Sequence, residues 1–506
     1  MEILGLVDVP LYVLLAVTAV VLTYIFGTWN HNYFKKRGIR GPAPYPFVGN
    51  STDAGFILDL YAWSQQYGSI YGIFVGRKPA LVITDLEILK EVLVKHFDNF
   101  RNRMNIPLPY PLSLALFVLE DDAWKRVRNT MTPTFTGVKL RRMCVAISDC
   151  TRTLTRNFSK VMGKNDGVNM KAYFGAYSMD VIAQTAFGIK VDSQNDFNNP
   201  FVGHAKMLFQ PTKLRLACAA FTNAVPVLEQ VFVNLDLGIF PRKVITFFET
   251  ITAELMNQRR HDKTHQQEPR TDFLQLMMDA SVEEGGGNNN ANGQTVKHSV
   301  RHLSTEEIVA QCILFFIAGY ETTGTTLTFI AYNLAKYPDV QEKAYNEIKE
   351  ILGNEEPNYD NIGKLKYLDN IITETLRLYP PAIALNRVVS ETIQIKGLTL
   401  SKGQTIFIPV MAIHRNPQLY KDPDSFKPER YEEQAKTISF QAFGFGPRIC
   451  IGMRLALVEV KVALVNVLRT VKFERMPDTP DVLTFIRNPN ILQTKQDITL
   501  KLSPRC

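Results

Sequence analysis

One cysteine in this sequence stands where its sulfur could act as a ligand. Cys450 belongs to the glycine-rich segment FGFGPRICIG at 443–452, and a helical pattern follows at 453–470. A thiolate at the amino end of a helix is stabilised by the helix dipole and by backbone N–H groups. Glycines let the backbone approach a flat ligand, and Arg448 could reach an anionic group on it. A helix cysteine without such neighbours, such as Cys312, is usually a small apolar residue.

Two other pairs of residues have helical spacings that would let them act together. Glu374 and Arg377 stand at i, i+3 on a helical pattern that ends before Pro380. On a protein surface such an ion pair contributes only about a few tenths of a kcal/mol. Trp124 and Arg128 are one helical turn apart, so both could face one ligand. A core tryptophan beside a solvated arginine would have the same spacing.

The segment around Cys450 resembles the haem-binding loop of the cytochrome P450 family, in which the cysteine is the axial iron ligand. The matching positions are Phe443, Gly444, Gly446, Arg448, Cys450 and Gly452. Four further stretches are similar to family motifs in the family order: Trp124 with Arg128, AGYETT at 318–323, ETLR at 374–377, and PERY at 428–431. In the last of these, Tyr431 replaces a phenylalanine. The resemblance covers about the whole chain after the amino-terminal segment, with the character of the membrane-bound animal drug- and steroid-oxidising branch.

The resemblance implies a cytochrome P450 fold with haem b between a long central helix and the cysteine loop, and with Cys450 as the metal ligand. The implied cofactor-binding residues are Arg103, Trp124, Arg128, Arg387, Phe443, Arg448, Cys450 and Gly452. An anionic propionate inside a protein needs paired donors, which accounts for the number of arginines. The resemblance further implies that Glu374, Arg377 and Arg430 form a buried structural network behind the haem. Removing one partner from such a network costs about 3–5 kcal/mol.

On the opposite face of the iron, the resemblance implies that Ala318, Gly319, Glu321 and Thr322 carry the oxygen chemistry. The small Ala318–Gly319 step would leave room beside the helix. The Thr322 hydroxyl would hold a proton there, and Glu321 would relay protons. The alternative for Thr322 is a hydroxyl group that donates back to a carbonyl of its own helix.

Family position also implies an apolar substrate pocket. Its expected lining residues are Leu114, Phe117, Phe316, Ile383 and Leu385. Few charges there would orient a polar ligand, so we expect loose binding and a broad range of lipophilic substrates. No feature of the sequence separates steroids, fatty acids and xenobiotics.

The implied function is that of an oxidoreductase, a haem-thiolate monooxygenase that inserts one atom of dioxygen into a lipophilic substrate. A thiolate ligand favours cleavage of the O–O bond. The electrons must come from a partner, because the chain has no flavin or nicotinamide fingerprint. By resemblance to microsomal members, NADPH would supply them through a flavin reductase, and a cytochrome b-type donor is compatible. Six basic residues would suit an acidic reductase, or be solvated or membrane-facing charges: Lys125, Arg126, Lys139, Arg141, Arg142 and Lys461.

Two other functions remain open at this point. One is a haem-thiolate isomerase that rearranges hydroperoxides or endoperoxides without a reductase. The other is a non-catalytic haem sensor that binds a gas or another ligand without turnover. The intact Glu321–Thr322 pair favours dioxygen activation over both.

Most of the elements that must position these residues are predicted to be helices. Ser304 and Glu307 have the spacing of a capping box, which predicts that the central helix begins there. Short alternating patterns predict strands near 71–74, 80–84, 392–395 and 405–408. We therefore expect a mainly α fold with a small β portion.

The amino-terminal residues, 1–30, predict a transmembrane anchor. No residue from Val9 to Trp29 is charged, and this length can cross a bilayer as a helix. Basic residues follow the span, which predicts that the rest of the chain faces the cytosol. A cleaved signal peptide is the alternative, but it lacks its basic start and its small-residue cleavage site. We expect a single-pass protein of the endoplasmic reticulum membrane, with the sequons at Asn50 and Asn157 unglycosylated.

After the anchor we expect a basic, proline-rich connector at 31–50 and one haem-binding catalytic domain at 51–506. Polar and low-complexity residues at about 261–300 predict a flexible surface insert. The apolar segment 217–241 has two interpretations, a buried core segment or a surface that dips into the membrane interface.

The composition excludes several classes of protein. A chain of 506 residues with 46% hydrophobic and 21% charged residues is neither disordered nor collagen-like. The net charge of +8 suggests an acidic partner or a membrane surface rather than nucleic acid. Six cysteines without a CxxC pair argue against a disulfide scaffold or a zinc cluster, and for a reducing compartment.

Overall fold

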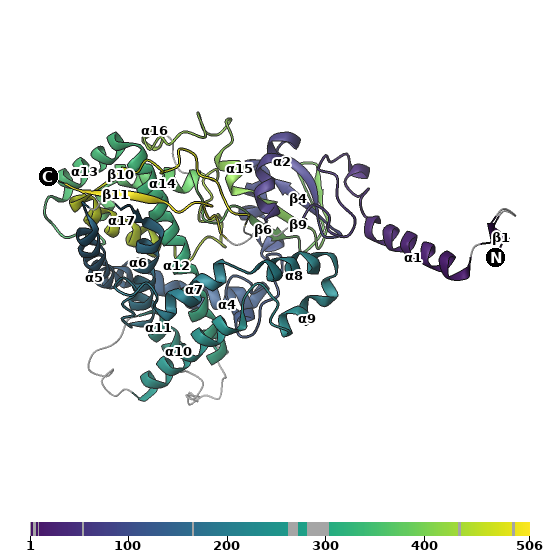
Figure 1. The fold of residues 1–506 in the computed structure, drawn as a ribbon, viewed down its shortest axis with the longest axis horizontal. Coiled ribbons are helices and arrows are strands. Elements are labelled where there is room, and N and C mark those ends of the chain that lie inside the picture. The colour runs from purple at the N-terminus through teal and green to yellow at the C-terminus, as the bar shows by residue number, and fades with distance from the viewer. Residues whose placement is uncertain are drawn as a thin grey trace, which may run out of the picture.

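The computed structural model describes residues 2–3, 7–8, 10–52, 55–163, 166–261, 272–280, 303–433, 437–487 and 491–505. Helices build most of the body, and short strands form small sheets (Figure 1). The helices are α1 Leu11–Thr28, α2 Asp59–Tyr67, α3 Leu86–Lys90, α4 Asp121–Met131, α5 Gly137–Val161, α6 Met170–Phe187, α7 Pro200–Phe209, α8 Lys213–Ala224, α9 Glu229–Asn234, α10 Arg242–His261, α11 Phe273–Asp279, α12 Thr305–Lys336, α13 Pro338–Leu352, α14 Lys366–Leu378, α15 Val410–His414, α16 Arg430–Glu433 and α17 Met453–Thr470. The mainly α class with a small β portion is confirmed.

The strands are β1 Glu2–Ile3, β2 Val7–Asp8, β3 Ile70–Val75, β4 Lys78–Ile83, β5 Val168–Asn169, β6 Leu385–Val388, β7 Ile393–Ile395, β8 Leu398–Leu400, β9 Thr405–Ile408, β10 Val471–Arg475 and β11 Thr499–Pro504. The largest sheet has the order β3-β4-β9-β6, with β4 parallel to β9 and the other pairs antiparallel. Leu385 and Arg387 are two residues apart on its edge strand β6. Side chains alternate along a strand, so both project from one face of the sheet.

The central helix α12 begins where the sequence predicts. The Glu307 N–H donates to the Ser304 hydroxyl at 3.1 Å, and the Ser304 N–H donates to the Glu307 carboxylate at 3.0 Å, so the capping box is formed. Helix α6 packs along α12, and both are largely buried. A Cβ at Gly324 of α12 would lie 3.0 Å from the Gly175 Cα of α6. Glycine at this crossing therefore lets the two backbones approach closely.

Helix α1 projects from the end of the body that carries the four-stranded sheet (Figure 1). It is long and apolar enough to cross a membrane, and its side chains are mostly exposed. The residues after it are packed against the body. The rings of Phe34 and Phe74 lie 5.3 Å apart, and the Phe47 N–H donates to the Gly27 carbonyl at 3.2 Å. The segment 31–50 thus holds the base of α1 against the sheet.

The apolar segment 217–241 lies mostly on the surface, so the buried-core interpretation is wrong for most of its described side chains, with Val233 as a buried exception. It contains most of α8, and α9, which occupy the same end of the body as α1 and the sheet (Figure 1). Phe221, Val231 and Leu235 are exposed, and Val227 is 80% exposed. The segment breaks at Pro226 into short helices that cannot bury a continuous face.

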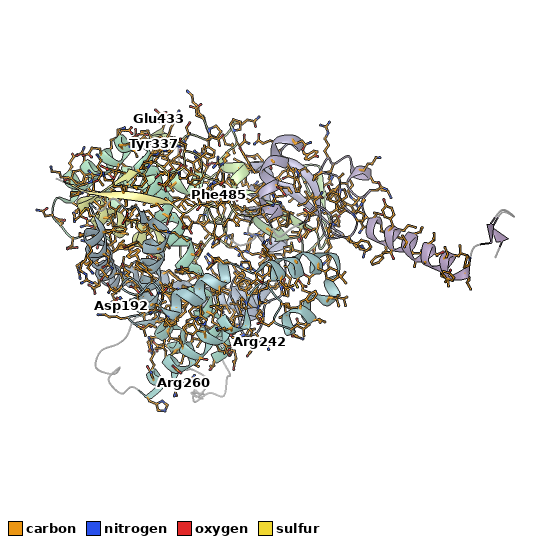
Figure 2. The ribbon with its side chains drawn as sticks, in the orientation of Figure 1. Asp192, Arg242, Arg260, Tyr337, Glu433 and Phe485 are labelled. Carbon is orange, nitrogen blue, oxygen red and sulfur yellow. The ribbon has the colours of Figure 1, made fainter. Side chains whose placement is uncertain are left out.

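The expected flexible insert at about 261–300 is wrong at its centre, where α11 is packed into the core. The ring centroids of Phe273 and Phe315 lie 3.8 Å apart. Asp272, which caps α11, forms an ion pair at 2.6 Å with Arg259 of α10, the helix with Arg242 and Arg260 near its two ends (Figure 2). Apolar residues at helical spacing explain this burial. Residues 262–271 and 281–302 lie outside the described residues.

Candidate active site

A cavity of about 450 Å³ lies between α12, α4, β6 and the loop 443–452. Many residues that the sequence suggests for the site line this cavity: Arg103, Phe117, Trp124, Arg128, Ala318, Gly319, Thr322, Leu385, Arg387, Phe443, Arg448, Cys450 and Gly452. They come from segments that are far apart in the chain. The tertiary structure therefore assembles one site from them.

Cys450 lies just before α17, and its side chain faces the cavity. The Cys450 N–H donates to the Phe443 carbonyl at 2.9 Å, which closes the loop. Burial raises the pKa of the Cys450 thiol, whereas the first N–H groups of α17 and the charges of Arg128 and Arg103 lower it. These groups stabilise a thiolate at the position where a ligand must be deprotonated.

The loop glycines have different structural roles. Gly446 has φ +78°, and a Cβ there would lie 2.1 Å from the Leu93 carbonyl oxygen. Glycine is thus required at position 446, because the backbone there is left-handed and because a side chain would clash with the Leu93 carbonyl. At Gly452 a Cβ would meet nothing within 4 Å, so packing does not require glycine there.

Four guanidinium groups gather at the cavity, and two of them have buried donors that are not satisfied. Nε of Arg387 and both Nε and Nη1 of Arg448 have no hydrogen-bond partner among the described residues. Burial, with the Arg103 charge, lowers the pKa of Arg448 to about 9 and that of Arg387 well below its usual range. Burial also lowers the pKa of Arg103 and of Arg128. Clustered buried cations with free donors need an anion, and haem propionates fit this requirement.

Trp124 is placed by contacts on both sides of α4. Its ring lies 4.4 Å from the Arg448 guanidinium carbon, as in a cation–π contact, and 5.6 Å from the Phe97 ring. Arg448 also donates to the Leu119 carbonyl at 2.7 Å. The tryptophan therefore orients Arg448 toward the cavity.

Two features of α12 differ from the expected oxygen-side arrangement. The Thr322 hydroxyl donates to the Ala318 carbonyl at 2.6 Å, so the alternative of a bond within the helix is the one formed. Thr322 still lines the cavity. A Cβ at Gly319 would lie 2.8 Å from the Ile182 side chain. The missing side chain at Gly319 thus accommodates α6.

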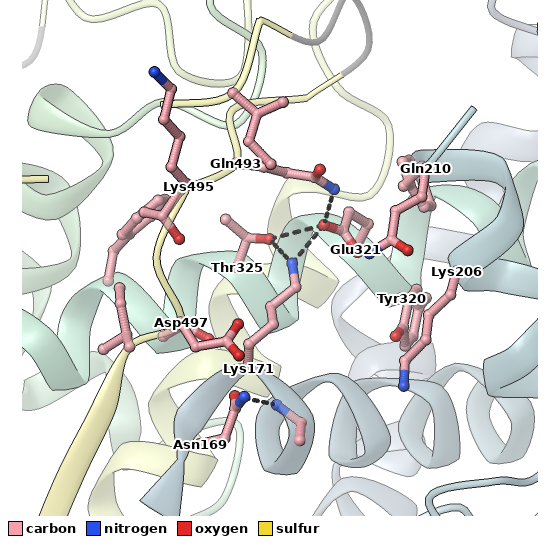
Figure 3. Close-up of a pocket in the computed structure, with 17 residues that line it drawn as sticks. Asn169, Lys171, Lys206, Gln210, Tyr320, Glu321, Thr325, Gln493, Lys495 and Asp497 are labelled. Carbon is pink, nitrogen blue, oxygen red and sulfur yellow. Dashed lines mark hydrogen bonds and ion pairs between the residues drawn. The ribbon is translucent and has the colours of Figure 1, made fainter. Parts of the chain in front are cut away.

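Glu321 does not line this cavity, so its expected place beside Thr322 needs correction. It lines a second pocket of about 430 Å³, where Lys171 contacts both Glu321 and Thr325 (Figure 3). Gln493 donates to the same carboxylate at 2.8 Å. Successive residues of a helix point about 100° apart, which separates Glu321 from Thr322.

The structure brings Glu374, Arg377 and Arg430 together in a buried network. Arg377 makes two bonds of 2.8 Å to the Glu374 carboxylate, and Arg430 makes one of 2.9 Å. Arg377 also donates to the carbonyls of His414 and Pro423 at 2.7 and 2.6 Å. The network joins α14 to the segment before the cysteine loop and does not line the cavity.

Three of the five expected pocket residues lie outside the lining of the cavity. Phe316 is fully buried in a cluster of rings, stacked on Phe187 at 4.0 Å and on Phe248 at 4.8 Å. Leu114 and Ile383 are also absent from the lining. Apolar residues not singled out in the sequence line the cavity instead: Ile182, Leu314, Phe315, Ile317, Ile372 and Leu376. Their apolar type carries no signal that distinguishes lining from core.

Sequence analysis also missed Glu459, a carboxyl group that lines the same cavity. Burial raises the pKa of Glu459 to about 8. Its side chain contacts Ser178 of α6 at 3.0 Å. An acidic residue inside the apolar stretch LALVEVKVAL is the signal that could have indicated it.

The six basic residues do not form one free surface. Lys461 is buried and pairs with Asp369 at 2.8 Å, because its face of α17 packs toward α14. Arg126 pairs with Glu307, and Arg141 contacts Asp360 at 2.7 Å. Lys125 and Arg142 are exposed, and Lys139 is partly exposed.

Comparison with known proteins places this geometry in context. The family model described as Cytochrome P450 matches residues 39–502. Cytochrome P450 3A29 of Sus scrofa is 40% identical over 509 residues, covering 98% of this chain and 96% of the relative. Cytochrome P450 3A13 of Mus musculus is 39% identical, covering 97% and 96%. Lithocholate 6-beta-hydroxylase of Mesocricetus auratus is 38% identical, covering 100% and 99%.

Proposed function

The chain belongs to the cytochrome P450 family of haem monooxygenases, and from this premise we propose that it oxidises lipophilic substrates, steroids among them, at a membrane surface. The single observation that carries the proposal is the shared cavity. Cys450 and the unsatisfied donors of Arg387 and Arg448 meet there, as a haem with a sulfur ligand and buried propionates requires.

We assign separate roles to the residues of the two pockets. Bound haem supplies the activation of dioxygen, with Cys450 as the sulfur ligand. Arg103, Arg128, Arg387 and Arg448 line the cavity and would bind and orient its propionates. Thr322 lines the cavity, and its hydroxyl oxygen can accept a hydrogen bond there while it donates to Ala318. Glu321 precedes Thr322 in the chain but lines the second pocket. Its carboxylate lies beside Lys171 there and can accept a proton.

The lining of the cavity supports a lipophilic substrate. Phe117, Ile182, Phe315 and Leu385 are among many apolar residues there. Such a surface attracts apolar compounds but fixes their orientation weakly. One relative is named for the 6-beta-hydroxylation of lithocholate, which supports a steroid among the substrates. Neither the isomerase nor the sensor gains support from the described residues or from the relatives.

We propose that the electrons come from NADPH through a flavin reductase, with a cytochrome b-type protein as a possible second donor. Lys125, Lys139 and Arg142 remain as candidates for the reductase contact after the other three basic residues are excluded or found in ion pairs. Exposed cations attract an acidic partner at long range.

A membrane location follows from two apolar surfaces at one end of the body. Helix α1 has the length of a span, and α8, α9 and the residues between them lie at the same end (Figure 1), with Phe221, Val227 and Val231 exposed. We propose that α1 crosses the endoplasmic reticulum membrane once. The residues of α8 and α9 would then enter the interface on the cytosolic side.

Incorporation of labelled oxygen tests this function. Purified protein, microsomal reductase, NADPH and a panel of steroids, fatty acids and xenobiotics are incubated under labelled dioxygen. One labelled atom in a product, dependent on NADPH, is the expected result. Unlabelled rearrangement of a hydroperoxide without NADPH would establish the isomerase instead, and ligand binding without any product would favour the sensor.

A further inference from the structure

A buried carboxyl group, that of Glu459, connects α17, the helix that follows the cysteine loop, to the central helix α12. Glu459 lies on α17, nine residues after Cys450, and is almost fully buried. Ser178 of α6 lies between Glu459 and α12. Its hydroxyl oxygen is 3.0 Å from Glu459 Oε1 and 2.8 Å from the carbonyl oxygen of Gly319. Thr323 of α12 hydrogen-bonds the same carboxyl group.

The number of protons available to Glu459 and Ser178 limits which hydrogen bonds can form together. A serine hydroxyl has one proton, and a backbone carbonyl can only accept. If Ser178 donates to Gly319, the contact between Ser178 and Glu459 needs a proton from the carboxyl group. If Glu459 is ionised, it can only accept, and Thr323 alone can give it a hydrogen bond without cost to Gly319. A hydrogen bond from Ser178 to the carboxylate then takes the hydroxyl proton away from the Gly319 carbonyl. The two protonation states of Glu459 therefore specify two different arrangements at Gly319.

We propose that Glu459 is a positioning residue, whose proton decides whether the Ser178 hydroxyl holds the Gly319 carbonyl of α12 or turns to Glu459. Gly319 lies between Ala318 and the Glu321–Thr322 pair, and Ala318 accepts the Thr322 hydroxyl. A change at the Gly319 carbonyl thus acts on the part of α12 that faces the cavity. This inference rests on the proposed oxygen-side role of α12.

The groups around Glu459 favour the neutral acid at ordinary pH. Helix α6 contributes the Tyr177 hydroxyl, which donates to the Glu459 backbone carbonyl at 3.1 Å, and α5 contributes Cys150. Burial raises the pKa of both side chains, so neither adds a charge. Asp180, further along α6, accepts from Ser193 at 2.7 Å.

No cation compensates a carboxylate at this position. Glu459 forms no ion pair in the part of the chain that the structure describes, and the nearby Lys461 points to Asp369. Glu321 of α12 is turned to Lys171 in the other pocket. With burial as the dominant cause, the pKa of Glu459 is raised to about 8. The switch between the two arrangements therefore falls within reach of a mild alkaline titration.

Infrared spectroscopy of the haem-containing protein can follow both the proton of Glu459 and the surroundings of α12, and it needs no catalytic turnover. The probe at α12 is carbon monoxide on the reduced haem, whose stretching band responds to the local field. The second signal is the C=O band of a protonated carboxyl group. Spectra are recorded from about pH 6.5 to about pH 9.5, where an unperturbed glutamate is already ionised.

Three variants separate the possibilities. In the wild type, we expect the carboxyl band to disappear and the carbon monoxide band to shift with one midpoint near pH 8. Glu459→Gln keeps a donor toward Ser178, so it should remove the carboxyl signal and hold the carbon monoxide band at its acid-side position. Ser178→Ala should keep the titrating carboxyl band while the carbon monoxide band no longer shifts. Glu350→Gln, on the exposed face of α13, is the control that should behave as wild type.

Other outcomes would overturn the inference. If Glu459→Gln leaves the titrating carboxyl band in place, the proton is held elsewhere. If Ser178→Ala retains the pH-dependent shift of the carbon monoxide band, the hydroxyl does not transmit the change. A protein that forms no thiolate-type carbon monoxide complex would instead count against the haem site, so the two failures are distinguishable.

Discussion

At the scale of single residues, the site depends on a few groups that are chemically unsatisfied without a ligand. Cys450 is one of them, because cations and N–H groups favour its thiolate while burial opposes it. Arg387 and Arg448 are others, since each has buried donors without partners among the described residues. Groups of this kind lower stability unless a ligand compensates them, so their presence together indicates binding.

Replacement of the sulfur ligand is the first prediction at this scale. Cys450→Ala should abolish the strongly red-shifted Soret band that a thiolate haem shows when it is reduced in carbon monoxide. Cys312→Ala is the matched control, because Cys312 is buried in α12 and does not line the cavity. An unchanged spectrum in Cys450→Ala, or an imidazole-type spectrum in the wild type, would contradict the ligand assignment.

The buried acid predicts a pH dependence of stability. The pKa of Glu459 is about 8 in the fold and 4.5 ordinarily, so its proton stabilises the fold fully below about pH 4.5. This contribution is lost as the pH rises to about 8, by up to about 1.4 kcal/mol per pH unit. The unfolding free energy of Glu459→Gln, measured in guanidinium at several pH values, should therefore rise relative to wild type over this range. Parallel pH curves for the two proteins would be inconsistent with a buried neutral acid.

At the scale of elements, polar networks decide how helices meet. The capping box of Ser304 and Glu307 sets where α12 begins. The helix then presents Thr322 to one pocket and Glu321 to another, as its 100° rotation per residue requires. Helix α14 is joined to the segment before the cysteine loop by Glu374, Arg377 and Arg430. These contacts position the cavity without lining it.

Removal of the central arginine of this network should unfold the protein and release its haem. Arg377→Met leaves the fully buried Glu374 with Arg430 as its one cationic partner and frees several carbonyls, which costs about 3–5 kcal/mol. Denaturant unfolding and haem content measure the two effects. Lys343→Met is the control, because Lys343 pairs with Glu429 at 2.9 Å on the surface and should change stability little. A stable Arg377→Met protein that has lost only activity would contradict the structural role.

At the scale of the whole molecule, the two apolar surfaces proposed to meet a membrane lie at one end of the body. The base of α1 is held by Phe34 and Phe47, and α8 and α9 share that end with the sheet (Figure 1). Burial raises the pKa of Glu229 on α9, and the nearby charge of Lys78 on β4 partly opposes this rise. Helix α9 therefore lies near the sheet. One surface can therefore bring both α1 and an apolar patch to the membrane.

The cytosolic orientation needs a better test than the natural sequons. Asn50 donates to the Ala43 carbonyl at 3.1 Å and Asn157 to the Gln194 carbonyl at 2.8 Å, and both are buried. Because both asparagines are buried in the folded protein, the absence of a glycan on them does not by itself establish the orientation. Glu356→Thr creates a sequon at the exposed Asn354. In cells we expect no glycan on this variant. A glycan should appear when a cleavable signal peptide replaces α1, because the domain then enters the lumen. A glycan on the variant that keeps α1 would contradict the cytosolic orientation.

Much of this protein can be predicted from local sequence, and the remainder depends on long-range packing. The cysteine loop, the capping box and the apolar segment at the amino terminus are local patterns, because a few neighbouring residues specify the chemistry or the backbone. Glu374, Arg377 and Arg430 were identified by resemblance, and the structure brings them together. Local pattern, however, does not tell which face of a helix meets which neighbour.

Three features were decided only in the tertiary structure. Phe316 belongs to a core of stacked rings, although its type suits a pocket equally well. Glu321 and Thr322 separate because α6 and Gln493 surround one side of α12 and the cavity lies on the other. Glu459 acquires its raised pKa from burial among α5, α6 and α12, elements that are distant in sequence. Burial and contact at such distances are properties of the assembled fold, and no short stretch of residues encodes them.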